Sequence, residues 1–320
     1  MNLDFHTLDV FTDRVFGGNP LGVFPATTHL SSELMQRVAL EMNLSETVFL
    51  GPPKTPDGTA QVRIFTPARE VPFAGHPTVG SALFLASGAW TGADGPRLPD
   101  FPEGDGEIDL VLEENVGPVP VTVRFEGGSP VFARFTTAIL PEHRPSPHSE
   151  ADLAALVGLS ESDIGGTGPS GAGLEPEMVS CGLEYFVIPV RSIDAVRRSR
   201  LDTARWQRML ADAWAHHVYV VCMDGEGDGV DVRVRMYAPG SGVAEDPATG
   251  SAAAALGGYL SAAHGGEEAS LQWTVEQGIE MGRPSLLYVE ADRTAGATSA
   301  VRVGGNAVPV SRGVMSVTER

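Results

Sequence analysis

The sequence predicts an α/β (α+β) protein made of two similar domains that arose by internal duplication. Two pairs of segments recur at a nearly constant offset: residues 36–50 (QRVALEMNLSETVFL) resemble 207–221 (QRMLADAWAHHVYVV), and residues 62–82 (VRIFTPAREVPFAGHPTVGSA) resemble 234–252 (VRMYAPGSGVAEDPATGSA). Two copies of one structural unit account for this better than a chance likeness of Ala/Gly-rich helices does. A third observation is that each half contains a helix with no polar face, at 77–88 and 247–263.

A helix without a polar face must be surrounded by other elements. We therefore expect each domain to be a curled, mostly antiparallel sheet or barrel around a central apolar helix. Because the two halves are similar, the N-termini of both central helices are expected to point into one cleft between the domains. That cleft is the predicted active site.

The remaining elements follow in the same order in each half. In the first half, apolar alternation and β-branched residues predict a strand pair (8–13 and 19–24), an amphipathic helix (31–43) and two strands (45–50 and 61–67). The apolar helix (77–88) and two further strands (108–114 and 119–125) follow. In the second half the corresponding segments are 178–190, 203–215, 216–223 and 231–239, 247–263, and 271–278, 285–291 and 300–305.

We place the domain boundary between residues 135 and 136, giving domains 1–135 and 136–320. The segment 139–158 (ILPEHRPSPHSEADLAALVG) contains three prolines and is interpreted as the crossover between them. The extreme C-terminal strands could return to the first domain. Residues 91–107 are rich in Gly, Pro and Asp, which is typical of a surface loop, and its role is not evident from the sequence.

Composition excludes several classes of partner. The formal net charge of −19 disfavours nucleic acid and anionic membrane surfaces, which repel an acidic chain. We find no signal peptide and no apolar stretch of membrane-spanning length, and the two cysteines, Cys181 and Cys222, lie in apolar runs as buried thiols. A cytoplasmic protein is expected.

The starts of the two apolar helices suggest an anion site. His76-Pro77 stands before one helix and Asp246-Pro247 before the other, so each proline is expected at the first helical position, with Asp246 as an N-cap. Small residues nearby, Gly75 and Gly250 among them, let a ligand approach the backbone N–H groups. The positive end of each helix suits a carboxylate.

Glu46 is the candidate acid/base. It begins the apolar strand ETVFL, where desolvation should raise the pKa of its carboxyl group towards neutrality. The alternatives are a solvated or capping glutamate, a structural role for His76 and a plain N-cap role for Asp246. The sequence shows no metal site, no dinucleotide fingerprint and no hydrolase elbow, and we expect no cofactor.

Five motifs, in this order, closely resemble the phenazine-biosynthesis PhzF-like isomerase family: GGNPLGVF, NLSETVFL, RIFTPAREVPFAGHPTVG, EDPATGSA and QGIEMGRPS. The resemblance runs from about Asp9 to the C-terminal strands. It implies the diaminopimelate-epimerase-like fold, a homodimer, and a reaction that needs no cofactor. It also implies roles for six residues: Glu46 as the catalytic acid/base, Gly75 and His76 in the loop lining the site, Asp246 near a polar substituent of the substrate, and Gly250 and Ser251 at its carboxylate.

Related racemases on this fold use one thiol from each half, and neither glycine-rich segment contains a cysteine here. The sequence therefore favours a cofactor-independent isomerase that moves a proton on a small carboxylate-bearing molecule. Two alternatives stay open: a non-thiol epimerase or racemase of amino or hydroxy acids, and an inactive small-molecule binding protein.

Overall fold

The computed structural model describes residues 1–91 and 95–318. The chain divides into two compact units: unit 1 comprises Met1–Thr136 together with Gly304–Arg320, and unit 2 comprises Thr137–Val303. Residues 304–320 thus belong with the first half of the chain. Of the loop expected at 91–107, residues 92–94 lie outside the described residues, and the next strand begins at Gly106.

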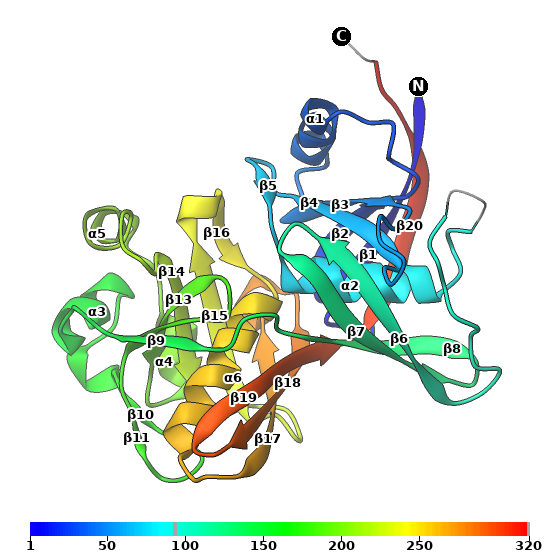
Figure 1. The fold of residues 1–320 in the computed structure, drawn as a ribbon. Helices are drawn as coiled ribbons and strands as arrows, with labels where there is room; N and C mark the ends of the chain where they lie inside the picture. The colour runs from blue at the N-terminus through cyan, green and yellow to red at the C-terminus, as the bar shows by residue number, and fades with distance from the viewer. Residues whose placement is uncertain (92–94, 319–320) are drawn as a thin grey trace. The chain divides into compact units, whose positions relative to one another are not determined.

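Unit 1 is one curled sheet around a helix. Its elements are β1 (Asn2–Val10), β2 (Asn19–Phe24), α1 (Ser32–Met42), β3 (Glu46–Gly51), β4 (Ala60–Phe65), β5 (Glu70–Val71), α2 (Gly75–Ala86), β6 (Gly106–Glu114), β7 (Gly117–Glu126), β8 (Ser129–Thr136) and β20 (Ala307–Ser316) (Figure 1). The strands pair in the order β20-β1-β2-β3-β4-β6-β7-β8, with β2–β3 and β4–β6 parallel and the other neighbours antiparallel. The short β5 pairs with β4.

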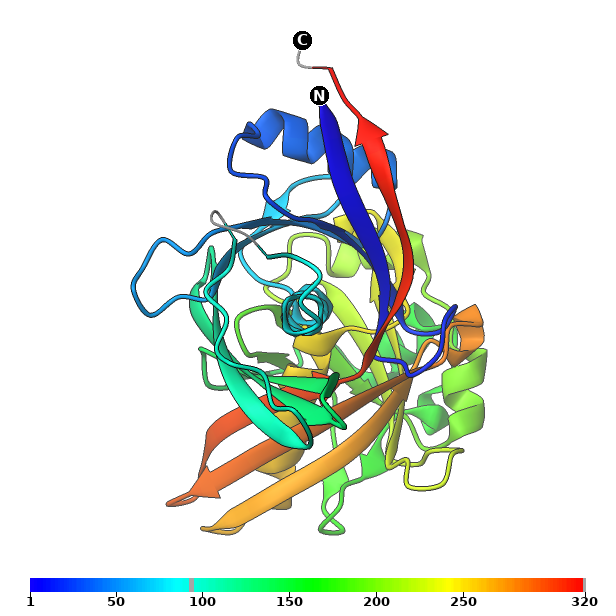
Figure 2. The same ribbon diagram turned by 90° about the vertical axis from the view of Figure 1, so that its right-hand side faces the viewer.

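The apolar helix α2 lies at the centre of this sheet. Every residue of α2 is buried, and Figure 2 shows the helix end-on, in cyan, inside a ring of strands. Gly80 permits the close approach, since a Cβ at this position would lie 2.5 Å from Leu21 Cδ2. The predicted surrounded helix is confirmed.

Unit 2 repeats this order with additional helices. Its elements are β9 (Glu142–Pro145), α3 (Glu150–Leu156), β10 (Gly166–Thr167), β11 (Gly173–Leu174), β12 (Glu177–Ser180), β13 (Glu184–Pro189), α4 (Ile193–Arg198), α5 (Thr203–Met209), β14 (His217–Cys222), β15 (Val232–Ala238), β16 (Val243–Asp246), α6 (Gly250–His264), β17 (Ala269–Gln277), β18 (Ser285–Thr294) and β19 (Ala297–Gly305), whose last two residues fall in unit 1. The strands pair in the order β9-β12-β13-β14-β15-β17-β18, with β13–β14 and β15–β17 parallel.

The parallel pairs occupy equivalent places in the two units, as duplication predicts. β2–β3 corresponds to β13–β14, and β4–β6 corresponds to β15–β17. The predicted α/β class with two similar domains is confirmed. Within the described residues, no helix has both the length and the apolar character needed to cross a membrane.

One local prediction is wrong. The expected helix 203–215 ends at Met209, and Trp206 Nε1 donates to the carbonyl of His216 (2.7 Å), which folds the following residues back against the helix. The segment 139–158, interpreted as the crossover, follows the start of unit 2 at Thr137 and contains β9 and α3. Ser149 caps α3 by accepting a hydrogen bond from the Asp152 N–H. Prolines in this segment precede the helix and do not interrupt it.

Candidate active site

The structure brings the predicted acid/base and the predicted histidine of unit 1 together. Glu46 is the first residue of β3, and His76 lies in the first turn of α2. His76 Nδ1 is 3.4 Å from Glu46 Oε2, and the side chains are 4% and 19% exposed. Glu46 is therefore the more accessible of the two, and His76 supports it from the interior.

His76 is a neutral imidazole. Burial lowers the pKa of His76 to about 3, because the interior disfavours the charged ring. A carboxylate near Nδ1 favours the tautomer that carries its hydrogen there. Nε2 is buried and has no hydrogen-bond partner among residues 1–91 and 95–318. His76 can thus orient Glu46 or a ligand by hydrogen bonding, without adding charge.

The predicted start of this helix is wrong. We expected Pro77 at the first helical position, but α2 begins at Gly75, so His76 and Pro77 lie inside the first turn. Proline is tolerated there because the first four N–H groups of a helix have no intrahelical acceptor. The N-cap residue is Ala74, whose side chain makes no capping hydrogen bond.

Glu114 is a buried carboxyl group near this turn that the sequence analysis missed. Its Oε1 lies 2.7 Å from Thr78 Oγ1, and burial raises the pKa of Glu114 to about 8. The alternation of the strand could have indicated this burial, because Ile108, Leu110 and Leu112 share a strand face with Glu114 and are buried.

In unit 2, Asp246 is placed differently from expectation. It ends β16 opposite Met236 of β15, and α6 begins at Gly250 with Thr249 as N-cap. The predicted N-cap role of Asp246 is therefore wrong, since a residue before proline is held in extended conformation. Its carboxylate Oδ2 accepts a hydrogen bond from Thr249 Oγ1 (2.5 Å).

Gln277, the last residue of β17, fixes the turn between Asp246 and α6. Its Nε2 donates to the Asp246 carbonyl (2.8 Å) and to Thr249 Oγ1 (3.0 Å), and its Oε1 accepts from the Thr249 N–H (3.2 Å). The side chain is fully buried. Gln277 belongs to the motif QGIEMGRPS, but its hydrogen-bond partners lie 28 and 31 residues away in the sequence, so the motif alone does not reveal this role.

The start of α6 carries the other two predicted residues, Gly250 and Ser251. Ser251 Oγ is 2.6 Å from the hydroxyl of Tyr185 on β13. A second buried phenol, Tyr219 of β14, has no hydrogen-bond partner within the described parts of the chain. Burial and the nearby Tyr185 and Asp246 raise the pKa of Tyr219 well above its usual value, so it stays protonated. The sequence did not single out Tyr185 or Tyr219, because each lies in an apolar segment typical of a core strand.

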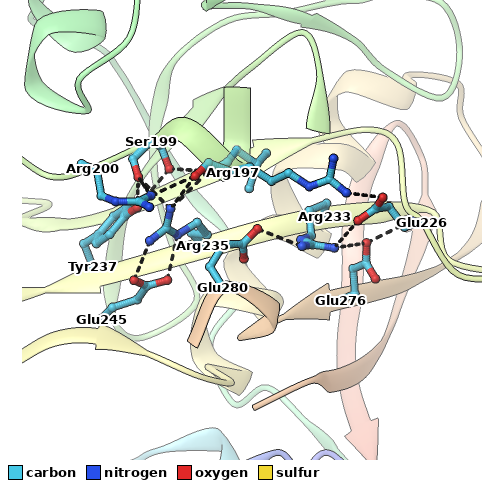
Figure 3. A network of polar contacts seen from close by, with 11 residues as sticks. Arg197, Ser199, Arg200, Glu226, Arg233, Arg235, Tyr237, Glu245, Glu276 and Glu280 are labelled. Carbon is cyan, nitrogen blue, oxygen red and sulfur yellow. Dashed lines mark hydrogen bonds and ion pairs between the residues drawn. The ribbon is translucent and has the colours of Figure 1, made fainter. Parts of the chain in front are cut away.

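Behind this turn, a network of ion pairs holds β15 and β16 (Figure 3). Arg235 binds Glu245 through two 2.8 Å hydrogen bonds, and Glu245 directly precedes Asp246. Arg233, whose side chain is 2% exposed, lies 2.8 Å from both Glu276 and Glu280. Bidentate and buried pairs of this kind restrict geometry more than exposed ones do.

The two thiols are buried and neutral, and neither lies in the turn before α2 or the turn before α6. Burial raises the pKa of Cys181 to about 12 and that of Cys222 to about 11. Cys181 Sγ donates to the Ala254 carbonyl (3.5 Å). Among the residues that the structure describes, no group of three His, Cys, Asp or Glu side chains could hold a metal ion.

Comparison with known proteins gives consistent matches over the whole chain. The family described as "Phenazine biosynthesis-like protein" matches residues 8–313. An uncharacterized isomerase from Mesorhizobium japonicum is 39% identical over 315 residues, covering 97% of each chain. The trans-2,3-dihydro-3-hydroxyanthranilate isomerase of Pseudomonas aeruginosa is 36% identical over 307 residues, covering 96% of each. The crystal structure of a PhzF-family protein from Bacillus anthracis superposes with a TM-score of 0.83 at 23% identity, covering 99% of this chain and all of the other.

Proposed function

Because the chain belongs to the phenazine biosynthesis-like family of PhzF-like isomerases, we propose that it is a cofactor-independent isomerase that moves a proton on a small carboxylate-bearing substrate, with Glu46 as the general acid/base. The observation that carries this proposal is the partly exposed Glu46 carboxylate beside the buried, neutral His76, at 3.4 Å. An acid/base must be reachable by substrate and held in one orientation, and this pair supports both.

The proposed reaction needs few groups. Glu46 removes a proton from an activated carbon and returns it at another carbon of the same conjugated system, so that a double bond shifts. His76 donates or accepts a hydrogen bond without becoming charged, which keeps the proton on Glu46 between the two steps. No redox change accompanies the transfer, because one proton leaves and one returns.

The carboxylate of the substrate is assigned to the start of α6, at Gly250 and Ser251. The N-terminus of a helix presents N–H groups and partial positive charge to an anion. Local attraction of this kind is required, since the overall net charge of −19 repels anions. The Asp246 carboxylate is assigned to an amino or hydroxyl substituent. That these residues act on the same substrate as Glu46 remains a prediction from the duplication.

The test substrate is trans-2,3-dihydro-3-hydroxyanthranilate, because a relative that is 36% identical is named as its isomerase. It carries the ring, the carboxylate and the conjugated system that the proposed reaction needs. Turnover is followed by the change in ultraviolet absorbance as the double bond moves, and by mass spectrometry in D₂O.

Glu46→Gln keeps the shape of the side chain and removes its acid/base function. We expect turnover to fall by roughly 10²–10⁴-fold, the usual contribution of general acid/base catalysis. Glu41→Gln on the exposed surface of α1 is the control and should keep full activity. An active Glu46→Gln enzyme would refute the mechanism.

The D₂O experiment also separates the alternatives. Deuterium entering a stereocentre without a double-bond shift would identify an epimerase. Binding of the substrate with neither deuterium uptake nor absorbance change would identify an inactive binding protein. Glu46→Gln and Asp246→Asn should both lower turnover if the two units act on one substrate.

A further inference from the structure

Glu114 is a buried carboxyl group that the proposed reaction does not use. It ends β6, is 7% exposed, and contacts the first turn of α2 through Thr78. Its Oε1 is 2.7 Å from Thr78 Oγ1. Its Oε2 is buried and has no hydrogen-bond partner within the described residues. A buried carboxylate with an unsatisfied oxygen is costly, so the environment favours the neutral acid.

The number of hydrogens available at Thr78 also favours the protonated form of Glu114. Thr78 Oγ1 lies 2.8 Å from the Ala74 carbonyl and 2.7 Å from Glu114 Oε1. A hydroxyl group has one hydrogen, and a carbonyl can only accept. If Thr78 donates to Ala74, the contact with Glu114 needs a hydrogen from Glu114, which only the protonated carboxyl group carries. Ionised Glu114 would instead draw the hydroxyl hydrogen away from Ala74.

This chain of hydrogen bonds spans the turn that holds the candidate site. Ala74 is the N-cap of α2, and Gly75, His76 and Pro77 lie between Ala74 and Thr78. The Thr78 backbone N–H (3.2 Å) and the Thr78 hydroxyl (2.8 Å) both donate to the Ala74 carbonyl, so the hydroxyl bond reinforces the backbone bond that closes this loop around His76.

The charged side chain next to Glu114 in the sequence and those on β4 and β5 bind partners other than Glu114. Glu113, the preceding residue of β6, accepts hydrogen bonds from the loop that follows β3. Glu70 of β5 pairs with Arg63 of β4 at 2.7 Å. Burial is the largest influence on the pKa of Glu114 and raises it to about 8, while a hydrogen bond donated by the Thr78 hydroxyl to the ionised form acts in the opposite direction.

The other elements around Glu114 place their charges elsewhere. On β7 the residue opposite Glu114 is Gly117, and Arg124 and Glu126 pair with each other at the far end of the strand (3.3 Å). On β8, Arg134 alternates with the buried Ala133 and Phe135 and so points away from α2. On α2 itself, His76 is neutral.

We propose that Glu114 is a positioning residue for His76: its neutral carboxyl group donates a hydrogen bond to Thr78, which keeps the Thr78 hydroxyl on the Ala74 carbonyl and so tightens the first turn of α2 beyond what the backbone bond alone does. Loss of the proton from Glu114 loosens this turn and moves His76 relative to Glu46. The isomerase then has an alkaline limit set by a residue that does not touch the substrate. The effect on turnover rests on the proposed function, whereas the protonation and the movement of His76 do not.

The experiment compares wild type with Glu114→Gln, whose amide donates to Thr78 but cannot ionise. The protein is labelled with ¹³C-histidine, the His76 resonance is assigned with a His76→Asn variant, and spectra are recorded between about pH 6 and 10. In wild type we expect the His76 resonance to shift with a midpoint at about 8. His76 itself does not titrate in this range because its pKa is about 3. In Glu114→Gln the step with a midpoint at about 8 should be absent.

Two further variants keep the test decisive. Glu113→Gln, beside Glu114 but bonded elsewhere, should behave as wild type. Thr78→Val keeps the shape of the side chain and removes the hydroxyl, so the His76 resonance should no longer follow Glu114 even if Glu114→Gln folds poorly. Infrared spectra of wild type at neutral pH should show the carbonyl band of a protonated carboxyl group, absent from Glu114→Gln.

Turnover supplies the last readout. Between pH 7 and 9, wild type should lose about tenfold in rate, as for one group titrating near pH 8, and Glu114→Gln less than about twofold. An unchanged midpoint in Glu114→Gln, or the absence of the protonated band, overturns the proposal. If wild type shows no turnover while the resonance still follows Glu114, the proposed function fails and the positioning role stands.

Discussion

Replacing Gln277 with leucine should destabilise unit 2 by about 3 kcal/mol. Leucine has nearly the same volume but cannot make any of the three hydrogen bonds of the amide, to the Asp246 carbonyl, the Thr249 N–H and Thr249 Oγ1. Thr249 Oγ1 keeps its bond to the Asp246 carboxylate. The two backbone groups are left without their partner, at a cost of about 1–3 kcal/mol each. Burying leucine in place of an amide returns about 1–2 kcal/mol.

The free energy of unfolding is measured by urea denaturation, followed by tryptophan fluorescence. Trp273 is buried on the same strand as Gln277 and reports on unit 2. The matched control is Gln272→Leu, at an exposed position of β17, which should change stability by less than about 0.5 kcal/mol. The slope with denaturant should not change, because the surface exposed on unfolding is the same. A Gln277→Leu loss no larger than that of the control would refute the role given to this side chain.

Three further predictions concern the supporting structure. Arg233→Met leaves the Glu276 and Glu280 carboxylates buried without their partner and should cost about 3–5 kcal/mol of unfolding free energy, whereas Arg302→Met, at a 26% exposed pair with Asp292, should cost less than about 1 kcal/mol. Gly278→Ala would place a Cβ 2.4 Å from the Arg283 carbonyl at φ +76° and should be several-fold more destabilising than Gly282→Ala, where φ is +72° but no atom lies within 4 Å; equal losses in urea would contradict this packing argument. Because folding raises the pKa of Glu114 from 4.5 to about 8, wild type binds a proton more tightly when folded and should lose stability as pH rises through that interval. Glu114→Gln should not show this loss. If the free energy of unfolding falls with pH equally in the two proteins, the prediction is wrong.

The sequence was sufficient for the repeat and the class of fold. In the matched segments 36–50 and 207–221, Glu46 aligns with His217, and each of these residues is the first residue of its strand, β3 and β14. The absence of a polar face predicted the central position of α2, because an apolar helix has no stable arrangement at a surface.

Helix starts and supporting side chains could not be predicted in the same way. The pairs His76-Pro77 and Asp246-Pro247 look equivalent, yet one lies within a helix and the other ends a strand. The difference arises from partners far away in the sequence, since Gln277 and Met236 hold the Asp246 turn. Local propensity carries no information about such long-range contacts.

The pairing of β20 with β1 has a consequence for how the chain folds during synthesis. β1 lies between β2 and β20, so the sheet of unit 1 stays incomplete until residues 307–316 have left the ribosome. Unit 2 is one continuous segment and is available earlier. Domains fold as units as they emerge, and contacts between distant segments form slowly. We therefore expect nascent unit 1 to expose the open edge of β1 until residues 307–316 have emerged and paired with it.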